Sequence, residues 1–430
     1  MKILIIGSGA REYAIGKKIH DQRGSEVQLF FAPGNAGTEL IGENVSIPDS
    51  EIASLLVFSQ EENIDYTIVG PEAPLVEGIA DVFERAGKLI FAPSKEASQI
   101  EGSKEFCKTI LASKNIPTAK YKAFKDADAA IKYAKELRDE SEQSLVVLKA
   151  DGLAAGKGVL IVSDDVDIEN GAKNVLENKI FGDQVLLVEE YLEGFETSLM
   201  GFFDGESFKL FNPVRDHKTI YEGNVGPNTG GMGTFTPDME ALMYRDEIKD
   251  QILDPFIEAI KINKIDYRGI VFFGLMITKE GPKVLEINTR FGDPETQVAL
   301  MALESDLLNL MMATSKRELN ECYIKINDKN IVNVVAASGG YPGSYEKGYD
   351  INGLDKLNDV EVFYAGVKSE DGKLLTNGGR VLSIAAADKS MEEAERIVYS
   401  EIERIEFKDM YYRKDIAPNV KRIYVNKKDE

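Results

Sequence analysis

Histidine and cysteine are scarce in this chain of 430 residues, which has two of each. Cys107 and Cys322 are too few for a disulfide framework, and neither lies in a Cys-x-x-Cys motif, so we expect a reducing, cytoplasmic setting. His20 and His217 leave almost no material for a His-dependent hydrolase or a multi-histidine metal site. Any catalysis is therefore expected to depend on carboxylates, lysines and backbone groups.

Basic charge and long apolar runs are also lacking. The chain has 51 basic and 73 acidic residues, a net charge of −22, which argues against duplex nucleic acid or an anionic membrane surface as partner, because both recruit basic faces. No apolar run is long enough to span a bilayer, and residues 1–6 are too short for a signal-peptide core. We expect a cytoplasmic protein that acts on small molecules. At about 150 residues per domain it has roughly three domains.

The first hundred residues alternate short apolar runs with helix-compatible stretches. The runs at 2–6, 27–31, 66–69 and 89–91 predict a small parallel α/β sheet, whose ligands bind at the carboxyl ends of the strands. Gly7 and Gly9 begin a dinucleotide fingerprint, but its third glycine falls on Glu12. NAD binding is therefore disfavoured, and a tight turn that faces a phosphate is the alternative.

A glycine-rich loop at 151–158 lies between two predicted strands, 145–149 and 159–162, and these predict a β-hairpin. Its Gly156-Lys157 pair does not complete a P-loop, because Gly158 stands where that motif has a hydroxyl residue. An ordinary hairpin turn is one interpretation. The other is a flap over a triphosphate, which Lys149 on the entering strand would help to hold.

A second predicted hairpin, with strands at 271–278 and 283–288, carries Glu286 and Asn288 two residues apart on one face. Two such oxygens suit Mg²⁺, which completes its octahedron with water and substrate phosphates. Manganese accepts the same ligands, so the sequence does not choose between the two metals. A solvated strand face is the alternative.

Two further segments indicate ligand contacts. Residues 226–233 contain four glycines and follow Asp216 and Lys218, which predicts a shaped loop that forms a ligand wall. The segment 189–192 combines backbone groups, an apolar side chain and a carboxylate, with Glu196 close behind. Adenine and ribose need that combination. The alternatives are a surface loop and an acidic helix start.

Helices are expected at 239–263 and 295–313. The pattern of apolar residues changes in the last hundred residues. Strands predicted at 331–337, 360–364 and 381–387 precede a helix with an apolar face between Ala394 and Ile405. This pattern predicts a small α+β domain at the C-terminal end.

Taken in order, these segments resemble the glycinamide ribonucleotide synthetases, a family of ATP-grasp enzymes. The matching motifs are APGNAGT (32–38), VGPEAPLVEGIAD (69–81), EGSK (101–104), KADGLAAGKGV (149–159), DHK (216–218), GPNTGGMG (226–233), NTRFGDPETQ (288–297), GGYPG (339–343) and NGGRVL (377–382). Some positions depart from the pattern. Tyr13 stands where histidine is usual, Asn224 where an acidic residue is common, and 417–420 replace Gly-His-Arg-Ala.

The resemblance implies a multidomain α/β and α+β architecture. It has an N-terminal parallel α/β substrate domain (1–101), an ATP-grasp domain (102–325) with a hinged lid at about 120–190, and an α+β C-terminal domain (326–430). The implied reaction joins glycine to 5-phosphoribosylamine with ATP, through a glycyl phosphate, in purine biosynthesis. The implied state is a monomer, with a dimer as the alternative.

The resemblance also implies roles for individual residues. The residues implied at the nucleotide are Lys104, Lys149, Gly156, Lys157, Gly158, Glu189, Tyr191, Leu192 and Glu196, and those implied at the metal are Glu286 and Asn288. The substrate residues would be Asn35, Gly37, Glu72, Asp216, Lys218, Asn228, Arg290 and Arg380, and the catalytic ones Arg290, Lys149 and Asp216. Two other hypotheses stay open: an ATP-grasp enzyme with formate or a carboxylation as its chemistry, and a regulatory nucleotide-binding protein without catalysis.

Overall fold

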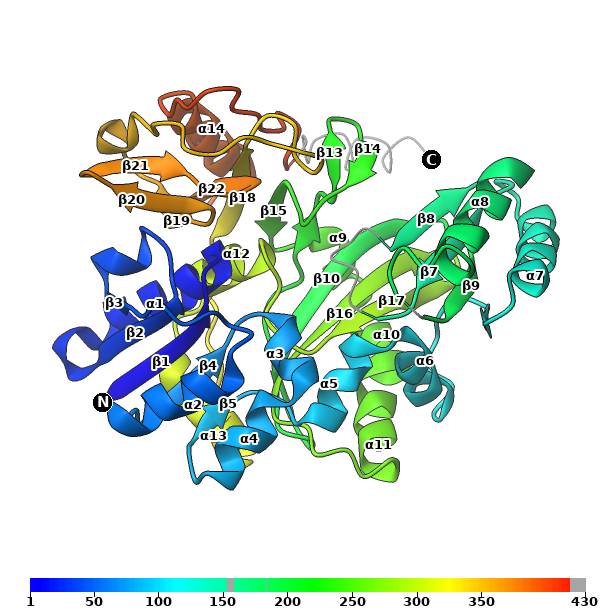
Figure 1. Cartoon of the computed structure of the whole chain (residues 1–430), viewed down its shortest axis with the longest axis horizontal. Coiled ribbons are helices and arrows are strands. Elements are labelled where there is room, and N and C mark those ends of the chain that lie inside the picture. Colours follow the sequence, from blue (N-terminus) through cyan, green and yellow to red (C-terminus); the bar gives the residue numbers. More distant parts are fainter. Residues whose placement is uncertain (153–157, 183, 418–430) are drawn as a thin grey trace.

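The computed structural model describes residues 1–152, 158–182 and 184–417. Its chain forms an N-terminal sheet, a central antiparallel sheet with a second sheet projecting beside it, and a C-terminal sheet (Figure 1). The predicted multidomain α/β and α+β class is confirmed. Within the described ranges no helix is long and apolar enough to cross a membrane.

The N-terminal sheet is parallel, as the alternating apolar runs predict, and has the order β3-β2-β1-β4-β5. Its side chains are buried on both faces, as expected of a parallel sheet between helices. The strands are β1 (Lys2–Gly7), β2 (Gln28–Pro33), β3 (Glu43–Asn44), β4 (Tyr66–Val69) and β5 (Ile90–Phe91). The helices are α1 (Ala10–Arg23), α2 (Ile52–Glu61), α3 (Glu72–Glu77), α4 (Ile79–Arg85) and α5 (Lys95–Gly102).

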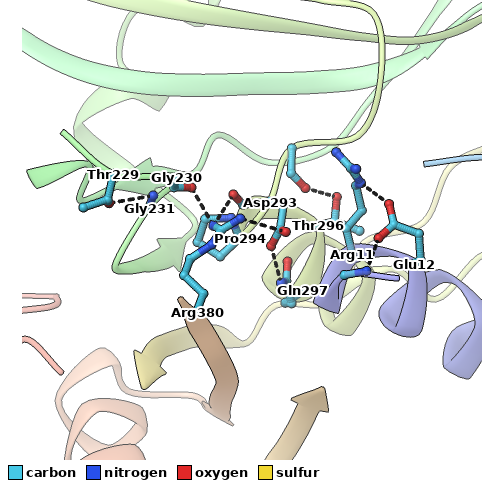
Figure 2. A network of polar contacts seen from close by, with 12 residues as sticks. Arg11, Glu12, Thr229, Gly230, Gly231, Asp293, Pro294, Thr296, Gln297 and Arg380 are labelled. Carbon is cyan, nitrogen blue, oxygen red and sulfur yellow. Dashed lines mark hydrogen bonds and ion pairs between the residues drawn. The ribbon is translucent and has the colours of Figure 1, made fainter. Parts of the chain in front are cut away.

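Glu12 explains why the first turn fails as a dinucleotide site. Its carboxylate accepts a hydrogen bond from the Gly9 amide at 2.7 Å, at the start of α1 (Figure 2). A Cβ on Gly70 would lie 1.9 Å from Glu12 Oε1, and one on Gly7 would lie 2.6 Å from its Cγ. The glutamate therefore fills the space beside the strand ends with its own negative charge, where a bound phosphate would need the same amide.

The segment expected as a lid forms a separate antiparallel sheet of order β6-β9-β7-β8. It has its own apolar core, with two helices packed against the sheet. The elements are β6 (Tyr121–Phe124), α7 (Ala127–Glu140), β7 (Val146–Ala150), β8 (Val159–Val162), α8 (Asp165–Leu176) and β9 (Leu186–Glu190). The pairing of β7 with β8 confirms the predicted hairpin around the glycine-rich loop.

The central sheet has the order β11-β10-β16-β17, and its strands are β10 (Phe195–Phe203), β11 (Phe208–Leu210), β16 (Gly269–Thr278) and β17 (Gly281–Asn288). Helix α6 (Lys104–Ala112) is capped by Ser103, whose hydroxyl accepts from the Phe106 amide at 3.1 Å. The prediction of helices over 239–263 is confirmed: α9 (Met239–Leu242) is followed, after a turn at 243–244, by α10 (Arg245–Ile248), a π-helical turn (Lys249–Leu253) and α11 (Asp254–Ile262), which run on without a gap.

The helices predicted at 295–313 are α12 (Glu295–Ala302) and α13 (Leu307–Lys316). Asp306 separates them, because its carboxylate accepts from the Asn309 amide and so caps the second helix. An apolar periodicity that continues through a capping residue does not by itself reveal such a break.

The C-terminal sheet has the order β12-β15-β18-β22-β19 and is covered by α14 (Met391–Ile402), in agreement with the predicted α+β domain. Two of its strands, β12 (Arg215–Asp216) and β15 (Gly233–Thr236), come from the middle of the chain. The others are β18 (Asn330–Ala337), β19 (Glu361–Tyr364) and β22 (Arg380–Asp388), with a separate hairpin of β20 (Val367–Glu370) and β21 (Lys373–Thr376). This shared sheet joins the C-terminal segment to the middle of the chain.

The prediction of one irregular loop over 226–233 is wrong. Part of it forms β14 (Val225–Asn228), which pairs with β13 (Thr219–Tyr221) in a two-stranded hairpin, and Gly233 begins β15. The glycines are tolerated because β14 is a short, exposed strand and Gly226 has a φ of +86°. Only the connection 229–232 between the two strands is irregular.

Candidate active site

Two lysines meet one carboxylate on the predicted nucleotide side. Lys149 Nζ, at the end of β7, lies 2.7 Å from Glu189 Oε2, and Lys108 Nζ, on α6, lies 3.1 Å from Glu189 Oε1. All three side chains are buried. Burial opposes the charge on Glu189, but the two lysines lower its pKa below the usual range. The cluster therefore holds two cations against one anion.

Glu189 was predicted to line a nucleoside, and its carboxylate instead lies inside the protein between the lysines. Lys108 was not among the predicted residues. It lies one helical turn after Lys104 on α6, so the i, i+4 spacing could have indicated a shared face. Burial lowers the pKa of Lys108, whereas Glu189 offsets burial at Lys149 and raises the pKa of Lys149.

Lys104 ties the start of α6 to the glycine-rich loop. Its Nζ donates to the Gly152 carbonyl at 2.8 Å, and its backbone amide donates to Asp151 Oδ1 at 2.5 Å. The predicted residues Gly156 and Lys157 lie outside the described residues. Gly158 is described, and its carbonyl accepts from the Ala150 amide at 2.8 Å. The chain therefore leaves the lid sheet beside Lys104.

The remaining nucleotide-side residues surround an apolar patch at the base of the lid. Leu192 is buried and packs in a small cluster with Ala119 and Met276, and Tyr191 beside it is half-buried. Glu196 at the start of β10 is exposed. An apolar side chain next to an exposed carboxylate is what a base and its ribose would contact.

Lys218 connects the predicted substrate and metal residues. Its Nζ lies 3.1 Å from Glu196 Oε2 and 3.7 Å from Glu286 Oε1. Burial opposes the charge, but the surrounding carboxylates raise the pKa of Lys218 well above its usual value. Lys218 and Lys149 likewise outweigh burial and lower the pKa of Glu286. Both groups are therefore ionised at neutral pH.

Glu286 and Asn288 fit a hard divalent cation in their chemistry. They lie two residues apart on β17, and the Glu286 side chain is 46% exposed. Among the described residues, no group of three or more His, Cys, Asp or Glu side chains gathers in a way that could hold a metal. A cation here would take its remaining ligands from water and from phosphate oxygens.

Arg290 lies between two carboxylates of the N-terminal part of the chain. Its Nη2 is 3.0 Å from Glu101 Oε1, and its Nε is 3.4 Å from Glu72 Oε2. Burial acts against the charge of Arg290, but the two glutamates raise its pKa. Glu101 belongs to the matching motif at 101–104 but was not among the predicted site residues. Its contacts with the Thr289 amide and with Arg290 show that it orients this arginine.

Arg380 is held by backbone and carboxylate groups from two other segments. It donates to the Gly230 carbonyl at 2.6 Å and the Asp293 carbonyl at 2.7 Å, and its Nη2 lies 2.9 Å from Asp293 Oδ2 (Figure 2). Asp293 in turn accepts from Gln297. The sequence did not predict a role for Asp293, because its partner Arg380 is remote in sequence.

Asp216 lies at the end of β12 with its Oδ1 shielded from solvent and without a hydrogen-bond partner. Burial, and then the nearby Glu295, raise the pKa of Asp216 well above its usual value. The Asp216 carboxyl therefore has a buried oxygen that is free to accept a hydrogen bond from a ligand.

The other predicted substrate residues, Asn35, Gly37 and Asn228, all lie in the described part of the chain and make no side-chain hydrogen bond or ion pair with Lys218, Glu286 or Asp216. Asn35 is buried, and its amide nitrogen donates to the carbonyls of Ser8 and Tyr364. Gly37 packs so tightly that a Cβ would lie 2.5 Å from the Tyr364 side chain. Asn228 is exposed at the end of β14. Asn35 and Gly37 therefore hold the N-terminal domain against β19.

Tyr13, the departure from the family pattern in α1, lies at the same junction. Its ring packs edge-on against Phe363 and Tyr364, and burial raises the pKa of its hydroxyl. This residue therefore helps to join the N- and C-terminal domains.

Comparison with known families matches three consecutive family models. Residues 1–101 match the Phosphoribosylglycinamide synthetase N domain, residues 102–296 its ATP-grasp (A) domain and residues 331–419 its C domain. A phosphoribosylamine–glycine ligase of Caldanaerobacter subterraneus subsp. tengcongensis is 46% identical over 97% of this chain and 99% of its own. One from Clostridium acetobutylicum is 44% identical, with the same coverage.

Solved structures agree with these matches. The crystal structure of a phosphoribosylamine–glycine ligase from Thermotoga maritima superposes with a TM-score of 0.82 at 33% identity, over 96% of this chain and all of that one. A biotin carboxylase from Campylobacter jejuni has a TM-score of 0.70 at 16% identity, over 99% of this chain and 96% of that one, which shows a shared fold alone. On its motifs, its three domains and these relatives, the chain belongs to the phosphoribosylglycinamide synthetase family.

Proposed function

We propose that this chain is a phosphoribosylamine–glycine ligase, which uses ATP to join glycine to 5-phosphoribosylamine and yields glycinamide ribonucleotide, ADP and phosphate in purine biosynthesis. Family membership and the full-length relatives of that name support this reaction. The contact of Lys218 with Glu286 is the observation that carries the proposal, because it joins a substrate-side lysine to a metal-side carboxylate.

ATP is expected between the lid sheet and the central sheet. Lys104 and Lys149 approach this space from α6 and β7, and they would bind the phosphates. The base would lie on Leu192 and take hydrogen bonds from the backbone of 189–192, while Glu196 would accept from the ribose. The glycine-rich loop would close over the nucleotide as part of a hinged lid.

In the first step a glycine carboxylate oxygen attacks the γ-phosphorus of ATP, the bond to the bridging oxygen breaks, and glycyl phosphate and ADP form. Arg290 would stabilise the negative charge on the transferring group, because Glu72 and Glu101 fix the direction of its guanidinium. Glu286 and Asn288 would hold Mg²⁺ or Mn²⁺, which neutralises phosphate charge when bound.

In the second step the amine of phosphoribosylamine attacks the acyl carbon, loses a proton and expels phosphate. Asp216 is the proposed proton-accepting or amine-orienting group, since its Oδ1 has no partner. The sugar phosphate would lie toward Asn35, Gly37, Asn228 and Arg380. The domain boundaries 1–101, 102–325 and 326–430 and a monomeric state, with a dimer as the alternative, are part of the proposal.

One assay tests this function. ADP formation is followed with ATP, Mg²⁺, glycine and phosphoribosylamine present, and then with each omitted in turn. We expect turnover only with the complete set. Turnover with formate or bicarbonate in place of glycine would instead support another ATP-grasp reaction, and ATP binding without any turnover would support a regulatory protein.

A further inference from the structure

The hairpin of β13 and β14 packs through only part of its surface: Ile220 is buried beside Met232 and Ala337, and the Tyr221 ring lies edge-on to the Tyr411 ring. Among the described residues it pairs with no other strand, and Tyr221 and Val225 are 53% and 57% exposed. Yet residues with proposed roles stand at its two ends. Lys218 immediately precedes β13, and Asn228 ends β14 opposite Thr219. The backbone of His217, just before Lys218, is paired with Gly233 and Met232, and on its other side the position of Lys218 depends on what holds this hairpin.

Arg413 adds side-chain hydrogen bonds to this packing. The side chain is fully buried, and all five of its N–H groups are bonded. Three bonds go to the hairpin: Nη1 donates to the Thr219 carbonyl and Thr219 Oγ1, both at 3.0 Å, and Nη2 donates to Asn224 Oδ1 at 2.9 Å. One arginine thus bonds the hairpin both at its base and at its turn, and we call Arg413 with its carboxylate partner the clamp.

Asp415 completes this clamp. Its two oxygens accept from Arg413 Nε and Nη2, both at 2.7 Å, and its Oδ2 also accepts from the Gly223 amide at 2.8 Å. The hydrogen bonds from Arg413 and Gly223 outweigh burial and lower the pKa of Asp415. The pair therefore stays charged at neutral pH, and the guanidinium is locked in direction as well as place.

The clamp is anchored in the C-terminal domain. Tyr411 exchanges two backbone hydrogen bonds with Ala337 of β18, and the Tyr399 hydroxyl on α14 donates to the Arg413 carbonyl at 3.0 Å. The same hydroxyl accepts from the Ile416 amide. The C-terminal segment 411–416 is thus a strap, fixed to one domain, that reaches a hairpin from the middle of the chain.

The hairpin base transmits this position to Lys218. The Lys218 carbonyl accepts from both the amide and the hydroxyl of Thr229, each at 2.7 Å, so the two ends of the hairpin are joined. From there the Lys218 side chain reaches Glu196 and Glu286. A shift of the hairpin would move the lysine away from both carboxylates.

We propose that Arg413 is a positioning residue for the ligase reaction, which acts through the β13–β14 hairpin to hold Lys218 beside Glu286. This inference rests on the proposed function for its kinetic consequence, while the clamp itself can be measured without turnover. The strap would then have a function: through it the C-terminal domain would set the geometry of a site whose proposed metal and nucleotide residues belong to the ATP-grasp sheets.

The test weakens the clamp from the hairpin side, so that the buried arginine stays in place. A Thr219→Val, Asn224→Gly double variant removes two of the three acceptors on the hairpin. The matched control is Asn63→Gly, which replaces another turn asparagine with left-handed φ, 54° against 59° at Asn224. Hydrogen–deuterium exchange of residues 219–228, the melting temperature, kcat and the KM of each substrate are compared.

We expect faster exchange in 219–228 and a loss of about tenfold in kcat/KM for glycine, because a small misplacement of groups at the reacting end is costly. The control should behave as the unmodified chain. Faster exchange with unchanged kcat/KM for glycine, or unchanged exchange, would overturn the proposal. An unmodified chain without turnover would instead refute the proposed function. In that case the exchange rates of residues 219–228 would still test whether the clamp holds the hairpin.

A second variant covers the case in which the double variant does not fold. Asn224→Asp keeps the acceptor and adds a charge beside Arg413, at a position where the family commonly has an acidic residue. Exchange in 219–228 should then be slower, with kcat/KM for glycine equal to or above that of the unmodified chain. Exchange that is faster or unchanged would count against the clamp.

Discussion

Lys149 lies 2.7 Å from Glu189, and both side chains are removed from solvent. Lys108 lies on the other oxygen of the same carboxylate, so the lid strands β7 and β9 and helix α6 meet at one charged point. A buried carboxylate between two lysines is costly to alter, because each remaining cation would lose its counter-charge. This relationship gives Glu189 a part in stability beside its proposed part at the nucleotide.

Replacing Glu189 with glutamine should destabilise the fold. We expect a loss of about 3 kcal/mol in the free energy of unfolding, from the broken buried ion pairs, and a raised KM for ATP as Lys149 moves. Urea denaturation and the ATP dependence of turnover measure the two effects. Glu190→Gln at the neighbouring, half-buried position is the control and should cost less than about 1 kcal/mol. Equal losses in the two variants would contradict a special role for Glu189.

Arg290→Lys should show whether the orientation of the Arg290 guanidinium matters in addition to its positive charge. A lysine keeps one positive charge but cannot bond Glu72 and Glu101 while also facing a phosphoryl group, because it lacks the planar fork. We expect kcat to fall by about a hundredfold with little change in melting temperature. Arg268→Lys, on an arginine paired with Glu84 and Asp266, serves as the comparison and should retain kcat. A variant with full activity would exclude Arg290 from charge stabilisation.

Glu286→Ala tests the metal assignment by a binding measurement. Removing the carboxylate leaves Asn288 as the protein oxygen of the proposed site, so the affinity for Mn²⁺, followed by its electron paramagnetic resonance signal, should fall by about tenfold or more. Activity should fall with it. Glu280→Ala, in the turn before the same strand, removes an equal charge and should leave Mn²⁺ affinity unchanged. Identical Mn²⁺ binding in both variants would show that the metal lies elsewhere.

His217 should make the fold weaker in acid. Burial, and next the charge of Arg413, lower the pKa of His217 to about 4 from 6.5, so the folded chain keeps this ring neutral while the unfolded chain protonates it. A group with a depressed histidine pKa loses its contribution as pH falls from about 6.5 to about 4, on the order of 3 kcal/mol in all.

The chain has one other histidine, His20, whose side chain is 44% exposed, and this makes the assignment practical. Urea midpoints between pH 4 and pH 7 should depend less on pH in His217→Gln than in the unmodified chain. His20→Gln should show the original dependence. A His217→Gln profile parallel to that of the unmodified chain would mean that carboxylates, and not this ring, cause the acid sensitivity.

Much of the fold and of the chemistry follows from local pattern. The parallel N-terminal sheet, the hairpin around 151–158 and the strand pair that presents Glu286 and Asn288 were predicted because apolar runs and turn residues lie next to one another in the chain. The lysines proposed at the nucleotide and the oxygen pair proposed at the metal are likewise visible as residue types at a short spacing.

The partners of those residues were decided by the tertiary structure. Asp293 holds Arg380 across 87 positions, and Thr219 holds Arg413 across 194. No periodicity reports on such distances, because each contact forms only when separately built sheets pack together. The same reason explains Glu189, which local sequence presents as a nucleoside residue and packing turns inward between two lysines, and Glu12, whose carboxylate fills a turn that its glycines alone would leave open.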